Sequence, residues 1–240
     1  MQATERRMAT EKREQSVGAA SVRDAGALPC SAHPALRIRR LGLAKFQPTY
    51  AAMRQFTSSR LANTPDELWI LQHPPVYTTG LAGRPEQLPQ DPAIPVARVD
   101  RGGQITYHGP GQVVVYTLLD LARRNLRIRE LVGLIEQSVI DALAPYGIHA
   151  ERRRAAPGVY VNGAKIAALG LRVRRGGCYH GLALNVDMDL APFFAIDPCG
   201  YPGLAVTQMR DLGVRATPEE MGERLAAQLT YLLAEHERKR

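Results

Sequence analysis

The stretch that decides the fold is Gly158-Val159-Tyr160-Val161-Asn162-Gly163-Ala164-Lys165-Ile166. An Asn-Gly pair between β-branched and aromatic residues is the strongest short-range signal for a β-hairpin, because both turn residues readily adopt positive φ. A second glycine pair, Gly176-Gly177, predicts a further hairpin that joins residues 165–173 to residues 178–186. The sequence therefore predicts two successive hairpins in this part of the chain.

Strand and helix patterns surround these hairpins. Apolar alternation and short apolar runs predict strands at residues 35–41, 66–72, 96–99 and 113–119. Helical spacing predicts helices at residues 48–61, 127–146 and 217 to about 236. The last of these begins with an N-cap at Thr217, a proline at Pro218 and a capping-box glutamate at Glu220. Two stretches look irregular: residues 73–80 are rich in turn formers and poor in the amide donors of a central strand, and residues 81–94 form a loop.

This order of elements predicts an α/β (α+β) fold, in which mixed β-sheets carry helices packed against them within a single domain. The chain has 240 residues, of which 45% are hydrophobic, and this is enough for a sizeable core. Residues 1–33 mix charged and small residues without apolar periodicity, so we expect a disordered N-terminal tail followed by a folded domain at residues 34–240.

Charge and cysteine content narrow the class of protein. The net charge is +8, and residues 1–40 supply half of it with eight Lys/Arg against four Asp/Glu. Only 6% of the residues are aromatic and no nucleic-acid motif is present, so we expect no nucleic-acid partner. Residues 113–119 form the longest apolar run, which is far short of a membrane span, so we expect no membrane partner. Three cysteines without a disulfide pattern and an acid-containing N-terminus favour a cytoplasmic location.

One cysteine has an unusual setting, in Ile196-Asp197-Pro198-Cys199-Gly200-Tyr201-Pro202-Gly203. The prolines fix φ and remove amide donors, while the glycines allow backbone angles that other residues avoid. A core cysteine needs no such loop, whereas a nucleophile must be exposed and held in place. Cys199 is therefore a candidate nucleophile, and a proline-rich turn with a small apolar residue is the alternative.

Three basic residues could activate this thiol. Lys165 begins a strand whose same-face neighbours are apolar, so partial burial would prepare its amine for proton transfer or for pairing with a thiolate. His108 and His180 each lie beside a glycine and could pair with Cys199 as in a cysteine hydrolase. The residues alone do not choose among the three. No metal site is expected, because Cys178-Tyr179-His180 lacks the spacing of a ligand pair.

The stretch Arg101-Gly102-Gly103-Gln104-Ile105-Thr106-Tyr107-His108-Gly109-Pro110-Gly111-Gln112 holds four glycines directly before an apolar strand. Such a loop can be a substrate cradle, because backbone without side chains can approach a ligand closely, or it can be a wide turn. Its spacing matches neither a P-loop nor a dinucleotide fingerprint, so it gives no reason to expect a nucleotide.

Together, these segments resemble the octanoyltransferases of protein lipoylation, which belong to the biotin/lipoate ligase-like fold. The resemblance covers about residues 36–215. It is carried by five ordered blocks: His73-Pro74-Pro75-Val76 with Gly80, the block 101–112, Gly158-Val159-Tyr160 with Lys165-Ile166-Ala167-Ala168-Leu169-Gly170, His180-Gly181-Leu182-Ala183-Leu184-Asn185, and Pro198-Cys199-Gly200. Two features depart from the family: Tyr160 stands where tryptophan is usual, and residues 1–33 have no counterpart.

The resemblance implies transfer of an octanoyl group from octanoyl-acyl carrier protein to a lysine of a lipoyl domain, with no cofactor. It implies that Cys199 forms an acyl-thioester and that Lys165 lowers the pKa of this cysteine. The substrate contacts that it implies are Arg101, Gly102, Gly103, Gln104, Ile105, Thr106, Tyr107, His108, Ala168, Leu169, Gly170, Gly181, Leu182 and Ala183. The alternatives are an ATP-dependent lipoate-protein ligase on the same fold, which would not need Cys199, and a cysteine hydrolase or amidotransferase.

Overall fold

The computed structural model describes residues 36–89, 93–154, 156–196 and 203–239. The tail expected at residues 1–33 and the candidate nucleophile Cys199 lie outside the described residues. The described strands are β1 (Arg37–Leu43), β2 (Glu67–Gln72), β3 (Val76–Thr79), β4 (Val96–Arg98), β5 (Ile105–His108), β6 (Gln112–Leu118), β7 (Glu151–Arg152), β8 (Val159–Val161), β9 (Ala164–Arg174) and β10 (Gly177–Asn185). The α-helices are α1 (Phe46–Ser58), α2 (Ile128–Leu143) and α3 (Pro218–Arg238).

The described strands form two sheets. The larger has seven strands in the order β1-β2-β6-β10-β9-β8-β7, and the smaller has the order β4-β3-β5. Pairs β1/β2 and β3/β4 are parallel and all the other pairs are antiparallel, so both sheets are mixed. The mixed α/β architecture predicted from the sequence is confirmed.

Both predicted hairpins are present in the larger sheet. Asn162 and Gly163 have φ values of 48° and 88°, which suit a two-residue turn between β8 and β9. The second turn is at Arg175-Gly176, one position earlier than the predicted glycine pair, and Cys178 pairs with Val173 across it. The long β9/β10 hairpin therefore follows from local sequence signals.

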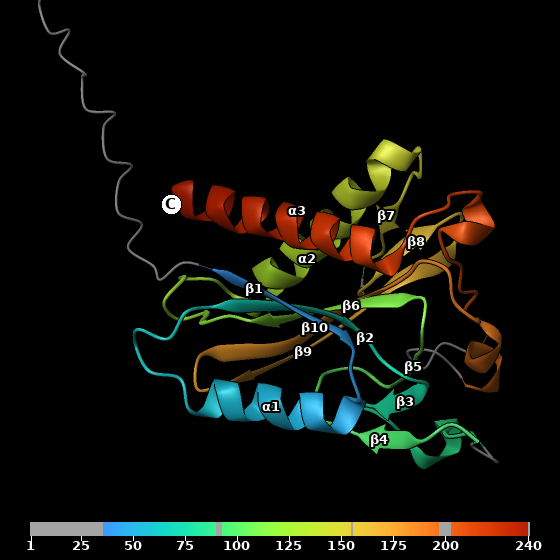
Figure 1. The fold of residues 1–240 in the computed structure, drawn as a ribbon, viewed down its shortest axis with the longest axis horizontal. Helices are drawn as coiled ribbons and strands as arrows, with labels where there is room; N and C mark the ends of the chain where they lie inside the picture. Colours follow the sequence, from blue (N-terminus) through green and yellow to red (C-terminus); the bar gives the residue numbers. More distant parts are fainter. Residues whose placement is uncertain (1–35, 90–92, 155, 197–202, 240) are drawn as a thin grey trace, which may run out of the picture. The chain divides into compact units, whose positions relative to one another are not determined.

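Helices cover the two faces of the larger sheet (Figure 1). Leu68, Ile70, Val113 and Val115 belong to the hydrophobic core shared with α2 and α3. The alternating residues Trp69, Leu71, Val114 and Tyr116 belong to a second core, together with Met53 of α1. Because β2 and β6 are buried on both faces, they read in the sequence as nearly continuous apolar runs.

Two sequence predictions were wrong. Residues 76–79 form β3, which is the middle strand of the smaller sheet. Pro74 and Pro75 precede this strand, so they remove no donor from its ladder. Within the glycine-rich block, residues 105–108 form β5, which pairs antiparallel with β3. The glycines of the block lie on either side of this short strand.

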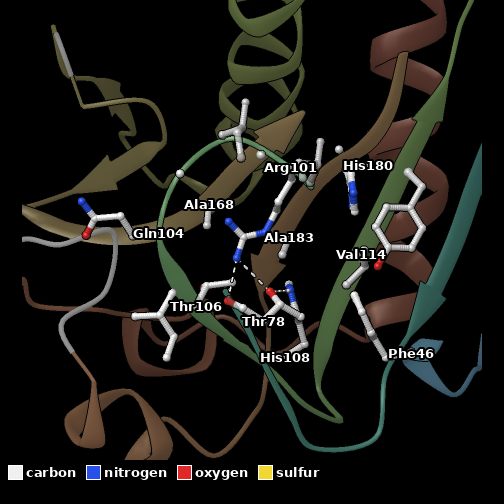
Figure 2. Close-up of a pocket in the computed structure, with 17 residues that line it drawn as sticks. Phe46, Thr78, Arg101, Gln104, Thr106, His108, Val114, Ala168, His180 and Ala183 are labelled. Carbon is white, nitrogen blue, oxygen red and sulfur yellow. Dashed lines mark hydrogen bonds between the residues drawn. The ribbon is translucent and has the colours of Figure 1, made fainter. Parts of the chain in front are cut away.

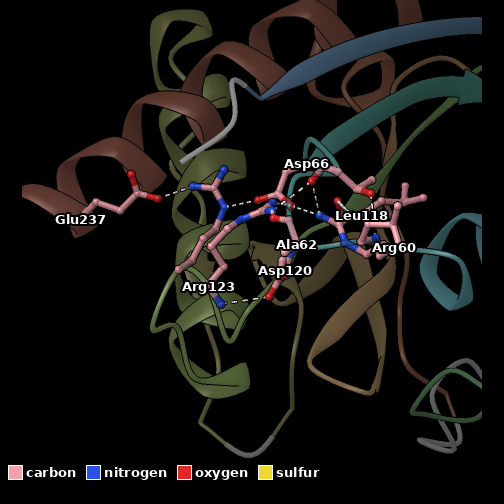
Figure 3. A network of polar contacts seen from close by, with 10 residues as sticks. Arg60, Ala62, Asp66, Leu118, Asp120, Arg123 and Glu237 are labelled. Carbon is pink, nitrogen blue, oxygen red and sulfur yellow. Dashed lines mark hydrogen bonds and ion pairs between the residues drawn. The ribbon is translucent and has the colours of Figure 1, made fainter. Parts of the chain in front are cut away.

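A buried ion-pair network lies where β2 begins (Figure 3). Asp66 is fully buried and its carboxylate accepts hydrogen bonds from Arg60, Arg123 and Arg124, the last two over 2.7 and 2.5 Å. Arg124 also pairs with Glu237 of α3. A single carboxylate therefore connects three arginines from two separate parts of the chain at the start of β2.

Helix α3 begins as predicted, since the Thr217 hydroxyl accepts from the amide of Glu220 over 3.2 Å and the Glu220 carboxylate accepts from the amide of Thr217 over 2.9 Å. Among the described residues, no helix combines the length and apolar character that crossing a membrane requires.

Candidate active site

The β9/β10 hairpin brings four small residues together. Antiparallel pairing sets Gly170 opposite Gly181 and Ala168 opposite Ala183. Directly paired residues point to the same face of a sheet, so these four positions form one surface. Because their side chains are short or absent, this surface leaves room above the strands.

This room is a cavity, here called the main pocket (Figure 2). It is bounded by β9 and β10 on one side and by α1, β3, β5, β6 and the segment before β5 on the others. Its lining consists of Phe46, Thr78, Arg101, Gly103, Gln104, Ile105, Thr106, His108, Val114, Tyr116, Ala168, Leu169, Gly170, His180, Gly181, Leu182 and Ala183.

Arg101 closes one side of the main pocket. Its side chain is nearly buried, and one guanidinium nitrogen donates to both the carbonyl and the hydroxyl oxygen of Thr78, each over 2.8 Å. A second nitrogen donates to the carbonyl of Gly102 over 3.0 Å. A Cβ on Gly170 would lie 2.7 Å from Cδ of Arg101, so the arginine lies against the backbone of β9. Gly170 is therefore needed for this arginine to lie where it does.

The structure gathers most of the substrate contacts implied by the resemblance. All of them except Gly102 and Tyr107 line the main pocket. Tyr107 packs instead against Tyr77 and Phe193, with ring centroids 5.5 and 5.6 Å apart. Gly102 donates its amide to the carbonyl of Leu171 over 2.9 Å. This bond attaches the glycine-rich segment to β9.

The sequence did not identify four other lining residues, Phe46, Thr78, Val114 and Tyr116. Phe46 lies on α1 and Thr78 on β3, and which face of each element meets the pocket depends on tertiary packing. Val114 and Tyr116 lie on β6, whose sequence gives no signal for them because both faces of that strand are buried.

Three histidines are held neutral near the main pocket. Burial lowers the pKa of His108 to about 3, and its ring lies 2.7 Å from Oε1 of Gln112. Burial also lowers the pKa values of His73 and His180 to about 4. His180 adopts a φ of 64°, and its ring contacts Asp100 at 3.3 Å. Neutral imidazoles suit a pocket from which water is excluded.

Asp100 lies beside His180 and remains charged. Burial alone would raise its pKa, but hydrogen bonds from Tyr179, Tyr50 and His180 outweigh burial and hold the pKa of Asp100 below its ordinary value. The Tyr179 and Tyr50 hydroxyls donate to this carboxylate over 2.5 and 2.8 Å. This cluster fixes the end of the main pocket that lies farthest along β9 from Lys165.

Lys165 is at the other end of this stretch of β9 and is 3% exposed. Its amine donates to the carbonyl of Pro157 over 3.2 Å and lies 5.2 Å from the ring centroid of Tyr160. Lys165 lines a small inner pocket with Thr106, Gln112, Ala168, Asn185, Phe193 and Val206, among others. The inner and main pockets share the wall residues Thr106 and Ala168.

Of the predicted pairing between Lys165 and Cys199, the structure describes only the lysine. The backbone of Lys165 donates to Ala205 over 2.8 Å and accepts from Thr207 over 3.0 Å. These partners follow Cys199 in the sequence, but Cys199 itself lies outside the described residues. His180 pairs with Leu171, six residues from Lys165 along β9, which corresponds to about 20 Å at ~3.3 Å per residue. His180 and Lys165 are therefore well separated.

A third cavity, here called the side groove, also reaches Lys165. It is lined by Ile128 and Val132 of α2, by Leu169 and Leu171 of β9, and by Ala82, Gly102, Gly103, Gln104, Ala156, Pro157, Lys165 and Gly170. Most of these side chains are apolar. Within the described part of the chain, no cluster of three or more His, Cys, Asp or Glu side chains is arranged to hold a metal ion.

Comparisons with known proteins agree with this geometry. Residues 48–230 match the lipoyl protein ligase A/B catalytic domain. The octanoyltransferase of Aromatoleum aromaticum is 62% identical over 200 residues, which cover 83% of this chain and 87% of the relative. The octanoyltransferase of Dechloromonas aromatica is 62% identical over 196 residues, which cover 82% of this chain and 96% of the relative.

Among solved structures, a lipoate protein ligase from Thermoplasma acidophilum with bound lipoic acid is similar, with a TM-score of 0.68. The match covers 82% of this chain and 86% of the other at 17% sequence identity, so it shows the fold alone. The family match and the two relatives together show that the chain belongs to the lipoyl protein ligase A/B catalytic domain family, and within it to the octanoyltransferases.

Proposed function

We propose that the chain takes its octanoyl group from octanoyl-acyl carrier protein and transfers it to a lysine of a lipoyl domain, through a thioester on Cys199. Residues 34–240 would act as the catalytic domain, in the cytoplasm and without a cofactor. The observation that carries this proposal is the position of Lys165. It lines the inner pocket, which shares wall residues with the main pocket, and its backbone is hydrogen bonded to Ala205, six residues after Cys199.

The main pocket suits a short acyl chain. Its floor of Ala168, Gly170, Gly181 and Ala183 is apolar and lacks bulky side chains. Burial of each acyl methylene would contribute about 0.8 kcal/mol. The tail would point toward Tyr116 and His180, and its carbonyl would lie toward the inner pocket. Backbone amides of the glycine-rich segment are candidate donors to the oxyanion of the tetrahedral intermediate.

The proposed chemistry has two acyl exchanges. The thiolate of Cys199 attacks the carbonyl carbon of the donor thioester, a new C–S bond forms, and the carrier thiolate leaves and takes up a proton. The acceptor amine then attacks the Cys199 thioester, loses a proton and expels the Cys199 thiolate. A nearby ammonium of Lys165 would favour the thiolate form of Cys199 and could supply the proton for the leaving thiol.

Both protein partners would approach a basic chain, in which residues 41–240 carry four of the eight net positive charges. The side groove offers a second route to Lys165 beside the main pocket, with which it shares Gly103, Gln104, Leu169 and Gly170. Its apolar wall suits the methylenes of an acceptor lysine. We propose that the acceptor lysine enters by this groove. Exposed Arg127 and Arg129 flank Ile128 at its rim and would face an acidic partner.

An ATP-dependent lipoate-protein ligase is the second candidate, because the similar solved structure is named a lipoate protein ligase. That likeness is confined to the fold, whereas the relatives above 60% identity are octanoyltransferases. The transferase needs no ATP, because a thioester already activates the acyl group. A hydrolase that pairs His180 with Cys199 is less well supported. His180 lies about 20 Å along β9 from Lys165 at ~3.3 Å per residue, whereas Lys165 is bonded to Ala205, six residues after Cys199.

The decisive experiment incubates the protein with octanoyl-acyl carrier protein in the absence of ATP and measures intact mass before and after addition of a lipoyl domain. We expect one octanoyl adduct that disappears as the lipoyl domain gains the same mass. An adduct that persists in Cys199→Ala, which has no nucleophile at this position, would exclude the thioester mechanism. A strict requirement for ATP would favour the ligase.

The role of Lys165 is tested by the pH dependence of Cys199 alkylation. We expect Lys165→Ala to move the alkylation profile to higher pH, because the thiolate loses a neighbouring positive charge. An unchanged profile in Lys165→Ala would contradict the pairing. A shift in His180→Ala instead would assign activation to the histidine.

A further inference from the structure

A short segment of three residues, 156–158, holds the amine of Lys165. The carbonyl of Pro157 accepts from Nζ of Lys165 over 3.2 Å. Gly158 adopts a φ of 141°, and a Cβ there would lie 2.9 Å from Cε and 3.2 Å from Nζ of the lysine. The lysine side chain thus runs directly against the backbone of this segment, and its position depends on where the segment lies.

The segment is anchored on both sides of Pro157. On one side, the amide of Gly158 donates to Oε1 of Glu136 over 3.0 Å. On the other side, the hydroxyl of Tyr160 donates to the carbonyl of Ala156 over 3.1 Å. The Pro157 carbonyl, which accepts a hydrogen bond from the Lys165 amine, therefore lies between two hydrogen bonds that do not involve the lysine.

Glu136 is the less expected of these anchors. It belongs to α2, whose other buried residues are apolar except for Ser138, and it is only 7% exposed. A buried carboxylate is costly unless hydrogen bonds or ions compensate it. Glu136 also lies 3.7 Å from Nε of Arg152, which is 40% exposed. The interior partner of the carboxylate is the Gly158 amide, so the carboxylate fixes the backbone that holds Lys165.

We propose that Glu136 is a positioning residue for the Lys165 amine, acting through the Gly158 amide and the Pro157 carbonyl. This inference rests on the proposed function of Lys165 in the transfer reaction. Glu136 does not touch substrate. Its loss would leave a buried N–H without its acceptor, and segment 156–158 would shift to satisfy it. The Pro157 carbonyl would then move away from the lysine amine.

The test follows the lysine amine directly. The chain has four lysines, Lys12, Lys45, Lys165 and Lys239, so trace labelling with acetic anhydride across a pH series can be read for each by peptide mass spectrometry. Lys45 and Lys239 serve as references within the same sample. The measured quantity is the midpoint of the labelling profile of Lys165 relative to these two.

We expect Glu136→Ala to move the Lys165 midpoint to lower pH, because the ammonium loses the carbonyl that accepts its hydrogen bond. We also expect a kcat for octanoyl transfer about 10- to 100-fold lower with little change in KM, since a misplaced group slows chemistry more than binding. Glu136→Gln should keep the Lys165 midpoint and kcat close to their wild-type values, because its amide oxygen can still accept a hydrogen bond from the Gly158 amide. Asp141→Ala, on the same helix and away from segment 156–158, should leave both unchanged.

A folded Glu136→Ala protein with an unchanged Lys165 labelling profile would overturn the proposal. If Glu136→Ala does not fold, Tyr160→Phe decides the matter, because it removes the second anchor and keeps the ring beside the lysine. A lower midpoint in Tyr160→Phe then supports positioning by segment 156–158, and an unchanged midpoint overturns it. Full activity in Lys165→Ala would contradict the proposed function instead, because labelling reports the amine whether or not it is catalytic.

Discussion

The backbone amide of Lys165 donates to the carbonyl of Ala205 over 2.8 Å, and the amide of Thr207 donates back to the carbonyl of Lys165. This reciprocal pair attaches the start of β9 to residues 205–207, although forty residues separate Lys165 from Ala205 in the sequence. The lysine thus belongs to a sheet and is bonded to a segment that begins six residues after Cys199 in the sequence. Rigid attachment is what a group needs when its distance from a reacting thiol matters.

Gly170→Ala should weaken acyl binding. The added Cβ would lie 2.7 Å from Cδ of Arg101, and that arginine is held by Thr78, so the main pocket must narrow or the guanidinium must move. Overpacking of this kind costs about 1–3 kcal/mol, so we expect a KM for the octanoyl donor about tenfold higher. Single-turnover acylation at several donor concentrations measures this.

Gly133→Ala is the matched control for Gly170→Ala. Nothing lies within 4 Å of a Cβ at Gly133 on α2. Alanine there should leave acylation unchanged and stabilise the helix by about 0.5–1 kcal/mol. Equal KM values for Gly170→Ala and wild type would contradict the role assigned to the floor of the pocket.

Asp66→Ala should be strongly destabilising. It would leave Arg124, which is buried, and Arg60 and Arg123, which are half-buried, without their shared carboxylate. Loss of one partner of a buried ion pair costs about 3–5 kcal/mol. Urea denaturation gives the change in the free energy of unfolding. Asp187→Ala, which breaks an exposed pair with Arg210, should cost at most about 1 kcal/mol. Similar losses in both variants would refute the structural importance of the network.

His73 should make the protein less stable in mild acid. Burial lowers its pKa from 6.5 to about 4, so between these values the unfolded chain binds a proton that the folded chain does not. The free energy of unfolding therefore falls as pH decreases through this window, by up to ~1.4 kcal/mol per pH unit from this residue. In His73→Asn the slope between pH 6 and pH 4.5 should be shallower by about that amount, while the exposed His149→Asn keeps the wild-type slope.

Thr217→Ala should destabilise the protein by about 1 kcal/mol, because the amide of Glu220 at the start of α3 loses its side-chain acceptor. Thr217→Ser keeps a hydroxyl at the same position and should be close to wild type. The midpoint of urea unfolding distinguishes the two variants. An alanine variant as stable as the serine variant would show that the cap contributes nothing.

Sequence reasoning succeeded where a local signal is strong. The Asn162-Gly163 turn and the Thr217 capping box are decided by residues within a few positions of one another, and both are present. It failed at β3 and β5, which are four residues each and owe their strand conformation to pairing with each other. Propensity is weak evidence for strands that short, since their stability comes from partners distant in sequence.

The main pocket shows the same difference between what local sequence signals predict and what tertiary contacts decide. The sequence, through the resemblance, identified the glycine-rich segment and the small residues of β9 and β10. It did not identify Tyr116, because β6 is buried on both faces and its pattern cannot say which face meets a cavity. It also gave no reason to connect Glu136 on α2 with Lys165, because that connection runs through backbone groups that pattern analysis does not read.

By itself, the sequence determined the hairpins, the helices, the chemical residue types and the family to which they point, because these depend on local conformational preference and on side-chain identity. The tertiary structure alone decided which faces of the strands enclose the main pocket, that Lys165 lies beside Ala205, and that His180 lies far from both. Those outcomes depend on register, and register is set by the packing of both faces of the sheet rather than by any one stretch of chain.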